Sequence, residues 1–184
     1  MNRERILRRR VYVLTWVFIV GLVLSGATAI PLRQELNWLA GITGARALVN
    51  APASTAPPGW AVWLTGVQAA INETALRHPF LFYGTDWLAF GHFVIAIAFI
   101  GALRDPIRNR WLFSFGMIAC VLVVPYAFVF GAVRSIPVWW RCLDCSFGVF
   151  GLVPLWLCRT WLEELEECLS RGMPTGSAGR TSRC

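Results

Sequence analysis

Three residues whose side chains can exchange protons interrupt long apolar runs: His92, Tyr126 and Asp144. An ionisable side chain at membrane depth is costly, so it normally faces the interior of a helical bundle and has a partner there. Each residue lies ~10 Å of helix rise from the outer end of its run, and Ser25 lies at a similar level. We therefore expect His92, Tyr126 and Asp144 to form one hydrogen-bonded cluster in the outer third of a membrane.

Charged residues are expected at the mouth of this site, where they can pair: Asp86, Arg134 and Arg141. A simpler interpretation needs no cluster. In that case Asp144 pairs only with Arg141, one helical turn away, and His92 bonds to a backbone carbonyl. Position along the chain gives the depth of these groups but not the direction in which they face, so both interpretations stay open.

A second candidate site is the pair Cys142 and Cys145, whose C-x-x-C spacing is typical of redox-active thiols. Four apolar runs, a long outer segment after the first and this motif at the outer end of the fourth resemble the vitamin K epoxide reductase family. The resemblance implies a thiol pair that reduces a quinone. That family also uses cysteines in the outer segment, and residues 33–85 contain none. The alternative is that both cysteines pack as small apolar side chains.

The cofactor cannot be named from these residues, although a quinone is one candidate. Haem b is disfavoured because bis-histidine ligation needs two histidines at one depth. The chain has only His92 and His78, and His78 lies outside the apolar runs. We expect no metal site, since no ligand spacing other than that of the cysteine pair is present.

The elements that must position these groups are long apolar stretches. Hydrophobic residues make up 57% of the chain and charged residues 15%, a balance shifted toward a lipid environment. Each stretch is about long enough to cross a bilayer core of ~30 Å. The sequence predicts an all-α, four-transmembrane-helix bundle with spans at residues 11–32, 87–103, 111–133 and 138–157.

The arginines predict the orientation of this bundle. All 17 basic residues are arginine, and most lie in the N-terminal segment, the loop around residues 103–110 and the C-terminal tail. Under the positive-inside rule, both termini are cytoplasmic in a multi-pass protein of a bacterial inner membrane. The arginines do not form one stripe, so we expect no nucleic-acid partner. Alternatively, the first run is a cleaved signal peptide that ends at Ala27-Thr28-Ala29.

The outer segment, residues 33–86, is predicted to carry short amphipathic helices on either side of a flexible linker at residues 50–59. One helical face joins Trp60, Trp63, Leu64, Val67 and Ile71; the residues expected to face elsewhere are Thr65, Gln68, Asn72 and Glu73. This helix lies either on the membrane surface or against the bundle. Residues 1–170 are expected to form one domain.

The C-terminal part is predicted to leave the membrane. Its acidic run is expected to face water: Glu163, Glu164, Glu166 and Glu167. Residues 171–184 are rich in Gly, Ser and Arg and are predicted to be a disordered cytoplasmic tail.

Four segments resemble an uncharacterised family of small bacterial four-helix membrane proteins: residues 25–32, 83–92, 104–106 and 141–151. This resemblance implies the topology and no activity. Gly91, Gly148 and Gly151 are expected to let helices approach closely. Pro125 is expected to kink its helix and to turn Tyr126 inward.

The sequence supports two functions equally. One is an intramembrane polar site that handles protons, a quinone or a small solute. The other is a structural or accessory subunit of a larger membrane complex or a homo-oligomer. Thiol–quinone oxidoreduction through Cys142 and Cys145 is a further alternative, and whether the chain is an enzyme stays open. In every case the lipid bilayer is the expected surrounding.

Overall fold

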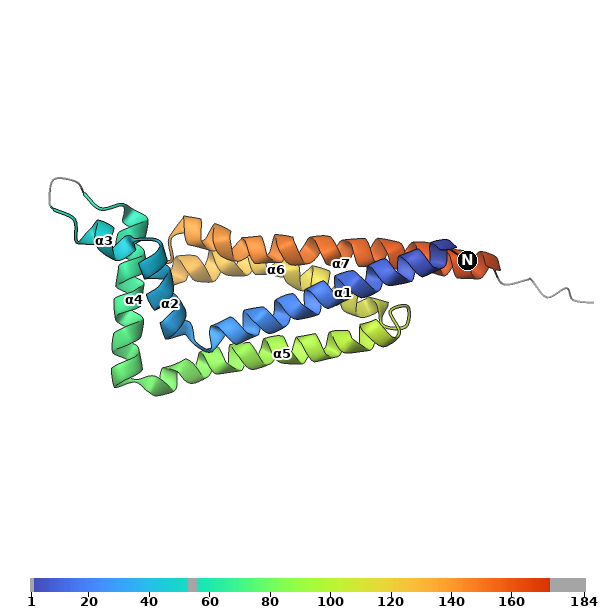
Figure 1. The fold of residues 1–184 in the computed structure, drawn as a ribbon, viewed down its shortest axis with the longest axis horizontal. Coiled ribbons are helices and arrows are strands. Elements are labelled where there is room, and N and C mark those ends of the chain that lie inside the picture. The colour runs from blue at the N-terminus through green and yellow to red at the C-terminus, as the bar shows by residue number, and fades with distance from the viewer. Residues whose placement is uncertain (1, 53–55, 173–184) are drawn as a thin grey trace, which may run out of the picture. The chain divides into compact units, whose positions relative to one another are not determined.

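The computed structural model describes residues 2–52 and 56–172, and this part of the chain consists of helices joined by short turns and contains no strand (Figure 1). Its helices are α1 (Asn2–Ala29), α2 (Leu32–Ile42), α3 (Ala45–Val49), α4 (Gly59–Arg77), the 3₁₀ turn η1 (Pro79–Phe82), α5 (Tyr83–Arg104), α6 (Arg110–Val133) and α7 (Val138–Gly172). Four of them are long and apolar enough to cross a membrane: α1, α5 with η1, α6 and α7. The predicted all-α fold with four spanning helices is therefore confirmed.

The helix ends differ from the predicted spans for identifiable reasons. α1 starts at Asn2 because arginines are good helix formers and continue the helix outside the apolar run. It ends at Ala29, where residues 30 and 31 form a turn, so the last residues of the first apolar run belong to the turn and to α2. α7 extends to Gly172, two residues into the predicted tail. The rest of that prediction, residues 173–184, lies outside the described residues.

Contacts group the chain into two units. Unit 1 comprises Met1–Ile19 and Ile97–Cys184, and unit 2 comprises Val20–Ala96, so α1 and α5 each continue from one unit into the other. Whether residues 1–170 form the single domain expected from the sequence stays a prediction.

The core of unit 1 lies toward the end that carries the N-terminus. Its buried side chains come from α1, the end of α5, α6 and α7, and include Val11, Phe99, Phe113, Leu155 and Leu162. α6 and α7 run side by side (Figure 1). In the halves of these two helices that lie away from this core, the apolar side chains are mostly exposed, as expected for helices surrounded by lipid.

Glycines allow α6 and α7 to approach closely. A Cβ atom on Gly148 would lie 2.6 Å from the carbonyl oxygen of Cys120, and one on Gly151 would lie 2.9 Å from the Cys120 sulfur. On α6, a Cβ atom on Gly116 would lie 2.7 Å from Leu155. The packing role of Gly148 and Gly151 is confirmed. It is wrong for Gly91, which has no such neighbour within 4 Å.

The acidic run of α7 is not simply a solvated face. Glu164 pairs with Arg3 of α1 at 3.2 Å, and Glu166 pairs with Arg110 of α6 at 3.0 Å. Arg10 of α1 lies over the ring of Trp161, 5.5 Å from its centroid. Glu163 and Glu167 are exposed, as predicted, whereas Glu164 and Glu166 are half-buried and also pair with α1 and α6, which continue alongside this part of α7.

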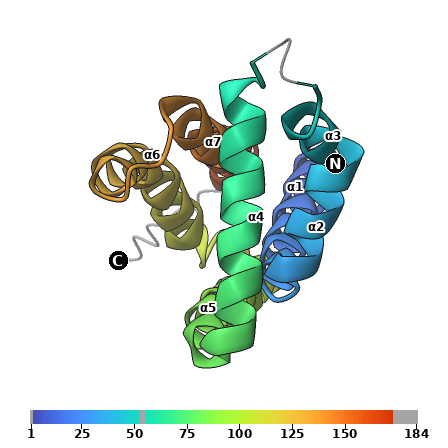
Figure 2. The same ribbon diagram turned by 90° about the vertical axis from the view of Figure 1, so that its left-hand side faces the viewer.

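In unit 2, α2 and α3 pack against α4, which runs crosswise to α5 (Figures 1 and 2). The small core between them is apolar and contains Leu36, Ala40, Ala45, Ala61 and Leu64. Gly44 links α2 to α3 with φ of 68°, a left-handed conformation that favours glycine. The predicted short helices of the outer segment are thus present.

A polar network accompanies this core and corrects one expectation. Gln68 of α4 is only 6% exposed and donates to Asn37 Oδ1 at 2.6 Å. The same Asn37 oxygen accepts from Asn72 of α4 at 3.2 Å and from Arg46 of α3 at 3.3 Å. Gln68 and Asn72 therefore face α2, not away from the packed side of α4. Hydrophobic periodicity missed them because their polar atoms are satisfied inside the unit.

Candidate functional site

Asp144 lies on the second turn of α7, which begins at Val138. Its side chain is half-buried, and its carboxylate has no hydrogen bond or ion pair with any described residue. Nearby hydroxyl groups behave differently, since Ser146 donates to the carbonyl of Leu143 at 2.6 Å. Asp144 is thus a hydrogen-bond acceptor on a helix long and apolar enough to cross a membrane, and no described residue supplies its partner.

Arg141 does not pair with Asp144. Its Nε donates instead to the carbonyl of Ile136 at 2.7 Å, and its side chain lies against Gly131 of α6. The α6–α7 turn creates this acceptor, because Ser135 adopts a left-handed conformation and Ile136 N–H bonds back to the carbonyl of Gly131. The simpler interpretation, an Asp144–Arg141 pair, is wrong.

His92 lies on α5 in unit 2, half-buried, with Nδ1 2.8 Å from the carbonyl of Leu88. The predicted bond to a backbone carbonyl is confirmed. A carbonyl only accepts, so Nδ1 carries the proton and Nε2 presents its lone pair when the ring is neutral. Close packing holds the helix at this point, because a Cβ on Gly26 of α1 would lie 3.0 Å from the His92 Cβ.

Tyr126 follows Pro125 inside α6 and is 65% exposed. Its ring packs on Phe130, with centroids 4.5 Å apart. The expectation that Pro125 turns Tyr126 inward is wrong for unit 1, since the ring lies on the surface of that unit. Ser25 is likewise exposed on unit 2.

The residues predicted at the mouth of the site have separate surroundings. Arg134 ends α6 and is exposed. Asp86 lies in the first turn of α5 and lines a shallow hollow with Tyr83, Trp87 and Phe90. Because His92 and Asp86 belong to unit 2 while Tyr126, Asp144, Arg134 and Arg141 belong to unit 1, their joint cluster stays a prediction.

The cysteines of the C-x-x-C motif are both free thiols on α7, Cys142 exposed and Cys145 half-buried. Two other cysteines have packing roles. Cys120 lies against Gly148 and Gly151, and the buried Cys158 donates weakly to the carbonyl of Val11 at 3.8 Å. The described residues contain no group of three or more side chains able to hold a metal ion.

A cavity of about 360 Å³ in unit 1 was not anticipated as a site. Its lining includes Arg5, Arg8, Arg9 and Arg104, for which the sequence predicted only a role in orienting the chain. The sequence did contain a signal for this cavity, because Arg5, Arg8 and Arg9 are spaced to share one helical face just before the first apolar run.

Comparisons of the chain with protein-family models, curated proteins and solved structures found no match.

Proposed function

We propose that this is a multi-pass inner-membrane protein with both termini in the cytoplasm and a polar site in the outer part of the membrane. Asp144 is the central group of this site, with His92 and Tyr126 as its partners. The site handles protons, a quinone or a small solute. Proton exchange is the step to test, because a carboxyl group and an imidazole are both able to exchange protons.

The carboxylate of Asp144 is the observation that carries this proposal. It is half-buried on a membrane-spanning helix and has no partner among the described residues. An ionised carboxylate without a partner is costly in such a place, so it is retained where it binds a proton or a cationic group. Hydroxyl groups on the spanning helices, such as Thr15 and Ser146, need no ligand because they bond to their own helices.

His92 supports the proposal through its ring orientation. With Nδ1 bonded to Leu88, Nε2 is left as a proton acceptor. A carboxylate and an imidazole that are both available for exchange make a minimal proton relay. The exposed hydroxyl of Tyr126 is a third candidate member.

The test uses purified protein in liposomes that contain a pH-sensitive dye. After an imposed pH gradient, the wild-type protein should carry protons faster than Asp144→Asn by roughly 100-fold or more. Asp105→Asn is the matched control, because it removes a carboxylate from the α5–α6 loop and keeps an acceptor for the Arg108 N–H. Equal rates for wild type and Asp144→Asn would overturn the proposal.

A structural or accessory subunit is the second candidate, and the close α6–α7 contact favours it. Gly148 and Gly151 pack directly on Cys120, and Glu164 and Glu166 join α7 to two other helices. In that case, Asp144→Asn would leave the folded protein and any growth phenotype unchanged. A substitution in the helix contact, such as Gly148→Leu, would abolish both.

Thiol–quinone oxidoreduction through Cys142 and Cys145 stays a prediction of the resemblance. Trapping free thiols in cells tests it. A working pair alternates between thiol and disulfide, and replacing both cysteines by alanine abolishes activity. A pair that stays reduced and tolerates alanine at both positions excludes this function.

A further inference from the structure

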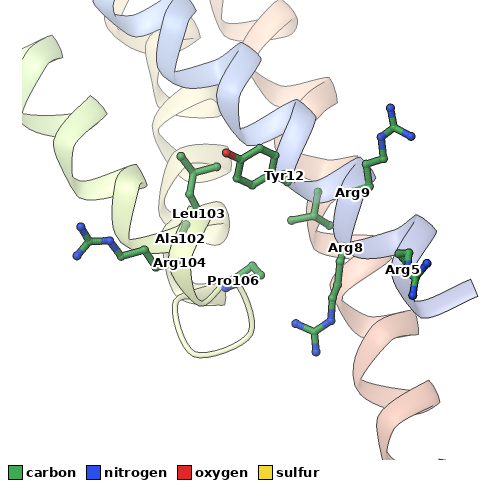
Figure 3. Close-up of a pocket in the computed structure, with 9 residues that line it drawn as sticks. Arg5, Arg8, Arg9, Tyr12, Ala102, Leu103, Arg104 and Pro106 are labelled. Carbon is green, nitrogen blue, oxygen red and sulfur yellow. The ribbon is translucent and has the colours of Figure 1, made fainter. Parts of the chain in front are cut away.

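The arginine-rich cavity in unit 1 combines an apolar floor with a basic rim (Figure 3). The floor is formed by Val11, Tyr12, Ala102, Leu103 and Pro106, from α1 and from the end of α5 with its following loop. Figure 3 shows the arginine side chains spread around the rim without meeting at one point. The cavity is therefore not a cage for one small anion. It suits a molecule with an apolar body and a negatively charged head.

The charge on this rim is largely uncompensated. Arg8 pairs with Glu4 at 2.9 Å, whereas Arg5, Arg9 and Arg104 form no ion pair within the described part of the chain. The nearest acidic loop residue, Asp105, accepts a hydrogen bond from the Arg108 backbone N–H. A zwitterionic head would leave this positive charge unbalanced, so the rim selects an anion.

The cavity also lies at a level that suits a lipid head. α5 ends at Arg104, and the apolar part of α1 begins at Val11. Trp161 lies beneath Arg10 at this end of the unit, and tryptophan is enriched at membrane–water interfaces. Basic pockets between transmembrane helices on the cytoplasmic side bind the heads of anionic lipids.

We propose that this cavity binds an anionic phospholipid of the cytoplasmic leaflet. Its negatively charged head lies among the arginines of the rim, which include Arg104, Arg9 and Arg5, and the upper part of an acyl chain lies on Leu103 and Tyr12. A guanidinium is suited to this role because it donates two parallel hydrogen bonds to phosphate oxygens. The inference is independent of the polar site around Asp144.

Native mass spectrometry of the purified full chain tests the proposal. The protein is incubated with equal amounts of phosphatidylglycerol and phosphatidylcholine. The wild-type protein should retain phosphatidylglycerol preferentially. Arg104→Gln should weaken this binding about fivefold, the effect expected for one arginine near an anionic lipid head. Arg108→Gln removes the same charge from the loop that follows α5 without lining the cavity, and this variant should bind as the wild type does.

A second variant addresses the apolar floor and keeps every arginine. Leu103→Trp fills the floor and should also reduce phosphatidylglycerol binding, with unfolding temperature measured to show that the protein is folded. If Arg104→Gln does not fold, Leu103→Trp alone decides the question. Equal retention of the two lipids, equal loss in Arg104→Gln and Arg108→Gln, or undiminished binding in Leu103→Trp would overturn the proposal.

Soluble competitors distinguish a lipid from a free phosphate. Inorganic phosphate and glycerol 3-phosphate carry the same head chemistry without an apolar chain. Neither should displace phosphatidylglycerol at millimolar concentration. Displacement by either compound would make the cavity a site for soluble phosphate compounds and would contradict the lipid assignment.

Discussion

At the scale of single residues, polar groups in this protein fall into those with partners and those without. Asn37 is the acceptor for three side chains, and Arg141 is held by the carbonyl of Ile136. Asp144 has no such partner among the described residues. The polar residues with partners hold the helices together. At the polar residues without partners, we expect the exchange of protons or the binding of ligands.

Asn37 gives a prediction at this scale. Asn37→Ala removes the acceptor of the buried Gln68, so unit 2 should lose about 1–3 kcal/mol of stability. The double variant Asn37→Leu with Gln68→Met replaces both partners by apolar groups and should recover most of that loss. Hydrogen exchange of α4 amides measures both. A double variant less stable than Asn37→Ala would contradict the network.

At the scale of elements, the contact between α6 and α7 depends on small residues. Transmembrane helices gain little from the hydrophobic effect in lipid, so close backbone approach supplies much of their attraction. Gly148 and Gly151 create that approach around Cys120. Gly148 lies one turn from Asp144 on α7, so this contact with α6 also positions Asp144 along the helix pair.

Gly148→Ala tests this contact. The added methyl group would lie 2.6 Å from both the Cys120 oxygen and a Val123 methyl carbon, so we expect a loss of about 1–3 kcal/mol from overpacking. Gly91→Ala is the matched control, because it is also helical but has open space around it, and it should be neutral or slightly stabilising. Thermal unfolding in detergent compares them. Equal effects of the two substitutions would show that the α6–α7 contact is not limiting.

At the scale of the whole molecule, the central expectation is that the two ends of the spanning helices face different compartments. In a cysteine-free background, Ala47→Cys on exposed α3 should react with a membrane-impermeant maleimide in intact spheroplasts. A variant that keeps only Cys168 of α7 should react only after permeabilisation. The reverse pattern would invert the topology and move the arginine-rich cavity to the outer leaflet.

Much of this architecture was predictable because hydropathy and length determine which helices cross a membrane. The four spans follow from composition alone, and only their ends moved, as at Ala29 and Gly172. Pairing between distant elements was not predictable. The pair between Glu164 and Arg3 depends on how α1 packs along α7. The hydrogen bond between Gln68 and Asn37 likewise depends on how α2 packs against α4.

The sequence predicts one depth for His92, Tyr126 and Asp144, and this common depth stays a prediction. The direction in which each side chain faces could not be predicted, because the rotation of a helix about its axis depends on packing. The bond from His92 to Leu88 and the exposure of Tyr126 are consequences of that packing. The arginine-rich cavity was not predicted, because the positive-inside rule already accounts for its arginines and so gave no reason to expect a binding site there.

The most direct test of the central claim is whether the carboxylate of Asp144 affects the imidazole of His92. The measurement is the imidazole ¹⁵N spectrum of the protein in bilayers, with His78→Gln leaving a single histidine. Asp144→Asn should move the Nε2 signal of His92, whereas Asp105→Asn should leave it in place. A His92 spectrum that is the same with and without the Asp144 carboxylate would contradict the shared polar site.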